Sequence, residues 1–166
     1  MTMASCQAYG EFYGVKSRTA PAIQLLLDLG VVVVGKTIMS QFADAEAPTG
    51  DFVDFHAPIN PRGDGNRMAG GSSFGSGAAV GGYNWLDFTI GTDSMKSLRL
   101  PCLVHQPGPD VALLTILWNN IAGGSVRQPA AHQSVYGIRP SRGMTSLDGT
   151  VAIHWFVYPP KGLDNT

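Results

Sequence analysis

The chain is most distinctive at residues 70–82, which read Gly70-Gly71-Ser72-Ser73-Phe74-Gly75-Ser76-Gly77-Ala78-Ala79-Val80-Gly81-Gly82. Small residues fill almost every position, so a helix over residues 73–82 would pack very closely against its neighbours. Residues 88–90, Phe88-Thr89-Ile90, have the composition of a short strand and precede Gly91-Thr92-Asp93. The run therefore predicts a close-packed helix followed by a strand.

A second helix is predicted upstream of this run. Thr19 can cap it, Pro21 suits its first turn, and Gly30 can end it in a left-handed turn. Its apolar face comprises Ile23, Leu26 and Leu27. Directly afterwards, the four valines of residues 31–34 form a β-branched run that is typical of a strand buried on both faces. A helix followed by a buried strand favours an α/β fold.

Length and composition indicate one loop-rich domain. The chain has 166 residues, of which 21 are Gly and 11 are Pro. Residues 45–71 show no hydrophobic period and predict a long loop, whereas residues 135–138 are a further strand candidate. Charged residues make up 14% of the chain, and the net charge is −1 without runs of one sign. We therefore expect neither nucleic acid nor a membrane surface as a partner.

The remaining compositional features favour a cytoplasmic protein. Cys6 and Cys102 lie far apart in the sequence and match neither a metal motif nor a disulfide framework. The most apolar windows, 23–34 and 111–118, are shorter than the roughly 18–20 residues of a membrane-spanning helix. Residues 1–7 lack the basic and apolar regions of a signal peptide. We predict no metal site and no cofactor.

Residues 30–37 match the phosphate-loop pattern of Gly, four residues, Gly, Lys and Thr. A phosphate loop needs a strand before its first glycine and a flexible loop across the four variable positions. Here a helix is predicted before Gly30, and the variable positions are the predicted strand 31–34. Nucleotide binding is therefore only a weak rival hypothesis.

Residues 71–75 match the Gly-x-Ser-x-Gly nucleophile elbow of α/β-hydrolases, which would make Ser73 the nucleophile. That elbow needs a strand running into it, and residues 62–70 do not have the composition of a central strand. The histidine partner would be His105, His132 or His154, and no neighbouring motif supports any of them. This interpretation is disfavoured as well.

Several blocks in a fixed order carry a more specific signal than either short motif. They are residues 70–79, Gly91-Thr92-Asp93, Gly123-Gly124-Ser125-Val126-Arg127-Gln128-Pro129-Ala130-Ala131 and Tyr136-Gly137-Ile138-Arg139-Pro140-Ser141-Arg142-Gly143. Together they resemble the amidase signature family, over residues 19–94 and 122–149. Residues 30–43, which contain Gly35-Lys36-Thr37, also resemble the strand and turn that precede the signature. Residues 60–65 and 85–88 look most like fungal members, some of them associated with secondary metabolism.

The resemblance implies a mixed sheet flanked by helices and the hydrolysis of small-molecule amides by two serines and a lysine. Ser125 would attack the amide carbonyl. Ser72, on a cis peptide, would pass protons between Ser125, the leaving amine and a neutral Lys. Such a base is needed because a serine hydroxyl is a weak nucleophile on its own. Taken alone, Ser72 and Ser73 could instead cap a helix, but the other blocks favour the catalytic interpretation.

The resemblance also implies the surroundings of the nucleophile. Gly123 and Gly124 would form the oxyanion hole, because glycines let consecutive backbone N–H groups converge on the developing negative charge. Asp93 and Arg127 would hold the two catalytic loops in place.

The chain departs from the family at its ends. The family's catalytic lysine lies farther before the Gly-Ser-Ser block than the 71 residues that precede Ser72. Lys36 belongs to the Gly-Lys-Thr turn and Lys16 to a Gly-Val-Lys context, so neither is a safe substitute. Residues 150–166 match nothing in the family. We therefore expect a single incomplete domain, with a catalytically inactive fragment or pseudoenzyme as the alternative.

A third departure is internal. The family runs from Asp-Thr directly into Gly-Gly-Ser, whereas residues 95–122, 28 in number, separate Ser94 from Gly123. Taking Ser97 as the nucleophile avoids the gap, but non-glycine residues then replace both glycines and the match soon ends. We prefer Ser125 and interpret residues 95–122 as a translated intron, because with suitable codons splicing would restore Asp-Thr-Gly-Gly-Ser.

Overall fold

The structure is a computed structural model that describes residues 3–43, 53–93, 100–105, 124–140, 144–146 and 148–150. In chain order its elements are α1 (Gln7–Tyr13), α2 (Pro21–Asp28), a short 3-10 helix (Gln41–Ala43), α3 (Phe74–Gly82), β1 (Phe88–Asp93), β2 (Leu100–His105), α4 (Arg127–His132) and β3 (Tyr136–Ile138). The helix predicted over residues 73–82 and the strands predicted at 88–90 and 135–138 are confirmed. Across the described ranges, no helix has the length and apolar character that a membrane span requires.

The three strands form one sheet in the order β1-β2-β3. Phe88 of β1 pairs with His105 of β2, which pairs in turn with Tyr136 of β3, and both pairings are antiparallel. A mixed sheet needs at least one parallel pair, so the strands described here do not themselves make the mixed sheet that the resemblance implies. The central strand β2 falls within the predicted insertion 95–122, so part of that insertion belongs to the sheet.

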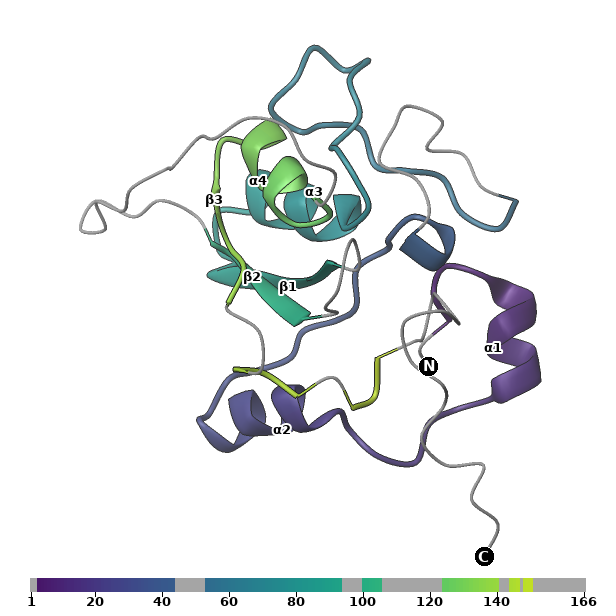
Figure 1. Cartoon of the computed structure of the whole chain (residues 1–166). Coiled ribbons are helices and arrows are strands. Elements are labelled where there is room, and N and C mark those ends of the chain that lie inside the picture. Colours follow the sequence, from purple (N-terminus) through teal and green to yellow (C-terminus); the bar gives the residue numbers. More distant parts are fainter. Residues whose placement is uncertain are drawn as a thin grey trace, which may run out of the picture.

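Helices α3 and α4 lie next to each other and pack against the sheet (Figure 1). Their approach is very close, because a Cβ atom at Gly77 would come within 2.8 Å of the Cβ of Pro129. The apolar core between these elements consists of Val80, Val126, Ala130 and Val135. The small residues of the glycine- and serine-rich run thus allow the contact that the sequence predicts.

Helix α2 confirms the second predicted helix, with one change at its start. Its N-cap is Ala20, whose methyl side chain has no atom that could accept a capping bond, so the predicted cap by Thr19 is wrong. Its end is as predicted. Gly30 has a φ of 89°, its N–H donates to the carbonyl of Leu27, and the N–H of Val31 donates to the carbonyl of Leu26. These bonds form the glycine-terminated Schellman motif.

The strand predicted at residues 31–34 does not form. This segment is irregular, and Val32, Val33 and Val34 are 80%, 54% and 65% exposed. A strand buried on both faces needs a neighbouring strand to bond its backbone and a layer on each face. The sheet of β1, β2 and β3 supplies neither to this segment. The prediction of a strand buried on both faces at residues 31–34 is therefore wrong.

The described part of the predicted loop, residues 53–71, contains no helix or strand, and an isolated antiparallel bridge joins Ile59 to Met68. It nevertheless binds the C-terminal ends of both core helices. The Arg62 guanidinium donates to the carbonyls of Gly81 at 2.9 Å and Gln133 at 2.8 Å. A cation at these ends also complements the helix dipoles. The loop therefore links the C-terminal ends of α3 and α4 through Arg62, and we call this contact the Arg62 clamp.

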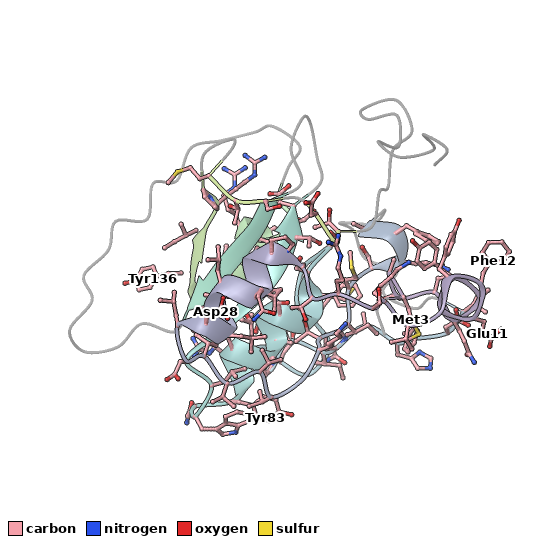
Figure 2. The ribbon with its side chains drawn as sticks, turned by 90° about the horizontal axis from the view of Figure 1, so that it is seen from below. Met3, Glu11, Phe12, Asp28, Tyr83 and Tyr136 are labelled. Carbon is pink, nitrogen blue, oxygen red and sulfur yellow. The ribbon has the colours of Figure 1, made fainter. Side chains whose placement is uncertain are left out.

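Helix α1 lies apart from the sheet and its two helices (Figure 1). Figure 2 shows Glu11 and Phe12 at the outer side of α1, and the Phe12 side chain is 82% exposed. Its first turn is bound by the carboxylate of Asp54, which accepts a 2.8 Å hydrogen bond from the N–H of Gln7. Tyr9 and Tyr13 stack on the same helix, and burial raises the pKa of Tyr9 above its ordinary value. The Tyr9 ring also contacts the ring of Phe42, with the ring centres 5.7 Å apart, which attaches α1 to the short 3-10 helix.

Candidate active site

Ser72 lies in the turn before α3, and the peptide bond that joins it to Gly71 is cis. This is the bond that the resemblance places before the second catalytic serine. The Ser72 side chain is fully buried, and its hydroxyl has no hydrogen-bond partner among the described residues. Its carbonyl accepts a 2.9 Å hydrogen bond from the N–H of Ser40. The backbone of Ser72 is thus held, while its hydroxyl is left without a structural bond.

Ser125 lies in the turn that leads into α4. Its side chain is also fully buried, and within the described ranges no group hydrogen-bonds its hydroxyl. Its carbonyl accepts a 2.9 Å hydrogen bond from the N–H of Ser73. Because Ser73 follows Ser72 directly, this bond sets the turn carrying Ser125 beside the turn carrying Ser72. The fold therefore brings together the segments of the two serines that the sequence singles out.

The hydroxyl of Ser73, unlike those of Ser72 and Ser125, is hydrogen-bonded. Its hydroxyl donates a 3.0 Å hydrogen bond to the carbonyl of Thr92 and accepts one of 3.0 Å from the N–H of the same residue. A hydroxyl bound on both sides ties α3 to β1 and is poorly placed to act as a nucleophile. His132, one of the histidines considered for an elbow, is exposed, and its ring packs against Gly70. The geometry does not support the α/β-hydrolase interpretation.

The end of β1 lies against the two turns that carry Ser72, Ser73 and Ser125, which we call the serine cluster. A Cβ atom at Gly91 would come within 2.8 Å of both the Ser73 hydroxyl and a methyl group of Val126. Such a distance leaves no space for a side chain. Glycine is therefore required here because three backbone segments converge at this point.

Asp93 ends β1 and is fully buried. Its carboxylate Oδ2 lies 3.5 Å from Nε of Arg139, which follows β3 and whose side chain is 28% exposed. The sequence analysis did not assign this partner, and the supporting role of Asp93 stays a prediction. Arg139 stands in the quoted block Tyr136-Gly137-Ile138-Arg139, and its charge beside a strand end is the signal that would have found it. Arg127, the other predicted support, begins α4 and is exposed, and its role stays a prediction.

Part of the predicted oxyanion hole is described. Gly124 is half-buried, and its carbonyl accepts a 2.7 Å hydrogen bond from the N–H of Gln128. Gly123 lies outside the described residues, as do Ser94 and Ser97. The oxyanion hole therefore stays a prediction.

Two lysines, Lys16 and Lys36, lie within the described residues. The ammonium of Lys16 lies 5.2 Å from the ring centre of Tyr13, which places it beside α1. Lys36 is exposed in the irregular segment after α2. That segment also has no phosphate cradle, since α2 ends just before Gly30 and the next helix begins only at Gln41. Neither an amidase lysine nor a nucleotide site is therefore identified in the described residues.

Comparison with known proteins identifies the family. The family described as Amidase matches residues 1–105 and 121–158. The chain belongs to the amidase family. The unmatched residues 106–120 lie inside the stretch 95–122 that we interpret as an insertion, whereas residues 95–105 of that stretch fall within the match. The match also extends over residues 150–158, for which the sequence analysis expected no resemblance. At the level of the amidase family, the function is the hydrolysis of amide bonds.

Curated relatives agree with this assignment. The chain is 32% identical to "Amidase 1" of Oryza sativa subsp. japonica, over 80% of this chain and 23% of that protein. It is 32% identical to "Amidase 1" of Arabidopsis thaliana, over 82% of this chain and 25% of that protein. It is 35% identical to a glutamyl-tRNA(Gln) amidotransferase subunit of Deinococcus deserti, over 83% of this chain and 22% of that protein. The chain thus spans about a quarter of the length of these relatives. No solved structure gives a significant match.

Proposed function

We propose that the protein hydrolyses amide bonds of small molecules, with Ser125 as the nucleophile and Ser72 as the proton relay. The observation that carries the proposal is the pair of fully buried hydroxyls without partners among the described residues, on turns joined by the hydrogen bond from Ser73 to Ser125. Buried hydroxyls normally find a partner, and exceptions are concentrated where a group has a catalytic role. Membership in the amidase family supports this role for both serines.

The chemistry runs in two stages. The Ser125 oxygen forms a bond to the amide carbonyl carbon, its proton moves to the Ser72 oxygen, and the proton of Ser72 moves to a neutral lysine. The carbon–nitrogen bond then breaks, and the leaving nitrogen takes a proton back from Ser72, which is reprotonated by the lysine. Water attacks the resulting acyl ester by the same route and releases the acid. Each proton that leaves a serine is thereby returned within the cycle.

The other predicted residues support this reaction. Gly123 and Gly124 would donate their backbone N–H groups to the oxyanion that forms when Ser125 attacks. The ion pair of Asp93 with Arg139 links the end of β1 to the chain after β3. We propose a small-molecule amide as the substrate and the cytoplasm as the location. We also propose a role in fungal secondary metabolism, because residues 60–65 and 85–88 look most like fungal members of the family.

We further propose that the 166-residue chain itself does not turn over, which retains the alternative of an inactive fragment. Neither Lys16 nor Lys36 matches the family's base, and residues 95–122 separate Asp93 and Ser94 from the two oxyanion glycines. The active form would be the longest protein that transcripts of the gene encode, with residues 95–122 removed and Ser94→Thr. Its sheet would form without β2, which lies in the removed stretch. We call it the spliced form.

A serine-directed fluorophosphonate probe tests the proposal. The spliced form should be labelled on Ser125, and labelling should disappear in Ser125→Ala. Ser73→Ala is the matched control and should still be labelled, because the Ser73 hydroxyl bonds Thr92. Peptide mapping that places the label on Ser73 contradicts the assigned nucleophile. Amide hydrolysis by the unmodified 166-residue chain contradicts the inactive-fragment proposal.

A further inference from the structure

The chain contains an Asp-Gly pair at two places, Asp64-Gly65 and Asp148-Gly149. Glycine has no Cβ beside its backbone nitrogen, so nothing on the residue shields that nitrogen from the carboxyl group of the preceding aspartate. Both glycines have a left-handed backbone, with φ of 86° at Gly65 and 81° at Gly149, and both pairs are exposed. The two pairs are therefore alike in their local geometry, and comparing them isolates the contacts of each carboxylate.

The carboxylate of Asp64 is held on both of its oxygens. Oδ1 accepts hydrogen bonds from the N–H of Asn66 at 3.0 Å and from the N–H of Arg67 at 3.2 Å. Oδ2 lies 3.6 Å from Nε of Arg67. The bond from Asn66 holds the pKa of this carboxyl below its usual value. Protonating Asp64, or turning its carboxyl group onto the nitrogen of Gly65, therefore requires breaking these contacts.

The carboxylate of Asp148 is not held in this way. No hydrogen bond or ion pair joins it to a residue in the described part of the chain. The turn is held through its backbone instead, because the N–H of Asp148 donates to the hydroxyl of Ser146 at 3.2 Å. The Asp148 side chain can therefore bring its carboxyl carbon onto the nitrogen of Gly149 without breaking a contact.

We propose that Asp148 is a site of spontaneous isoaspartate formation, whereas Asp64 is protected by its contacts. The nitrogen of Gly149 attacks the side-chain carbon of the neutral Asp148 carboxyl group. A carbon–nitrogen bond forms, and the carboxyl hydroxyl leaves as water with the proton of that nitrogen. Water then opens the cyclic imide at the backbone carbonyl carbon of Asp148, so that the chain continues through the side-chain carbonyl. One water leaves and one is added, so no other reactant is needed.

The modification would act on the start of α2. A Cβ atom at Gly149 would come within 2.8 Å of the Cβ of Ala20, which is the N-cap of that helix. The carbonyl of Ala20 accepts the first hydrogen bonds of α2, from the N–H groups of Ile23 and Gln24, both at 2.9 Å. Isoaspartate lengthens the backbone by one carbon atom, which displaces Gly149 from Ala20. The first turn of α2 should therefore loosen when Asp148 is modified.

The test incubates the 166-residue chain in mildly acidic buffer and follows both sites by peptide mapping with electron-transfer fragmentation, which distinguishes isoaspartate from aspartate. Asp148 should be modified about five- to tenfold faster than Asp64, the factor that one hydrogen bond provides. In urea the contacts of Asp64 are lost, so the two rates should become similar. The proposal is overturned if Asp64 reacts as fast as Asp148 in the folded chain, or if the ratio of the rates is the same in urea. It is also overturned if Asp148 is modified only in urea.

Asp148→Glu is the matched control variant, because glutamate would have to close a larger imide ring. Modification at residue 148 should disappear in this variant, while the rate at Asp64 should not change. After the same incubation, hydrogen exchange at the amides of Ile23 and Gln24 should be faster in the parent chain than in Asp148→Glu. Equal exchange in the two incubated proteins would disprove the effect on α2.

Discussion

The backbone N–H of Ser73 donates a 2.9 Å hydrogen bond to the carbonyl oxygen of Ser125, which joins the turn before α3 to the turn before α4. The two residues lie on either side of β1, the predicted insertion and β2 in the sequence. Directly beside this bond, Gly91 of β1 is so close that a Cβ atom would contact Ser73 and Val126. Three segments of the chain therefore meet at the serine cluster. The Ser73 hydroxyl is hydrogen-bonded to Thr92, whereas the hydroxyls of Ser72 and Ser125 have no partner among the described residues.

The hydroxyls of Ser72 and Ser73 should differ in their effect on stability. Ser73→Ala removes both bonds to the backbone of Thr92 and should lower the free energy of unfolding by about 1–3 kcal/mol. Ser72→Ala removes a hydroxyl without a partner in the described part of the chain and should change it little. Urea denaturation measures both. A larger loss in Ser72→Ala than in Ser73→Ala would contradict the structural role of Ser73.

The ion pair between Asp93 and Arg139 should be important for stability. Asp93→Asn leaves the Arg139 guanidinium, whose side chain is 28% exposed, beside a neutral group at the fully buried position of Asp93. Because solvent reaches Arg139, the cost should lie at or below the lower end of the about 3–5 kcal/mol for breaking a wholly buried pair. The exposed pair of Arg67 with Asp64 is the control, because solvent screens it, and Arg67→Ala should have little effect. Chemical denaturation compares the variants. Equal stabilities for the two variants would show that burial adds nothing to the first pair.

Arg62 should stabilise both core helices at once. Arg62→Met removes the hydrogen bonds to the carbonyls of Gly81, Gln133 and Ser134 and should lower the free energy of unfolding by about 2–3 kcal/mol. Arg62→Lys keeps the charge but not the forked donor group, so its effect should be intermediate. Thermal unfolding followed by circular dichroism provides the comparison. If the Arg62→Met variant unfolds at the same temperature as the parent chain, the Arg62 clamp does not stabilise the protein.

The loop that carries Arg62 should also respond to acid. The N–H of Asn66 donates to the carboxylate of Asp64 and holds the pKa of that carboxyl below its usual value. A lowered pKa in the folded state means that the stabilising contribution is present above the ordinary carboxyl pKa and is lost as the pH falls through the folded value. The amide NMR signal of Asn66 should therefore shift at a lower pH than an unperturbed Asp predicts. The control is Asp64→Asn, in which the amide signal of Asn66 should no longer show this pH-dependent shift, because residue 64 has no carboxyl group.

Helix α3 should reject side chains on the face that contacts α4. Gly77→Ala replaces glycine by a better helix former, a gain of up to about 1 kcal/mol. The added methyl group would nevertheless lie 2.8 Å from the Pro129 ring, and such overpacking costs about 1–3 kcal/mol, so we expect a net loss. Gly35→Ala, where the Cβ would meet no atom within 4 Å, is the matched control and should be neutral. A stabilised Gly77→Ala variant would disprove the close packing of α3 on α4.

The sequence predicted helix ends and strands correctly where residues close together in the chain determine them. The helix end at Gly30 follows from the freedom of glycine to adopt a positive φ, and the strand β1 follows from its β-branched and aromatic residues. The ordered blocks also identified the amidase family, because they combine several motifs at a consistent order. In contrast, the valines at 31–34 show that composition does not determine burial, which depends on whether other segments cover the strand.

The amino-acid sequence by itself thus determined the family, the candidate serines Ser72 and Ser125, and the small residues that permit close packing. Only the tertiary structure decided which groups meet: the partner of Asp93, the bond between Ser73 and Thr92, and the place of Ser40 beside Ser72. The physical reason is that these contacts join residues far apart in the chain. A hydrogen bond or ion pair of this kind depends on the folded path of several segments, and no local pattern of residues encodes it.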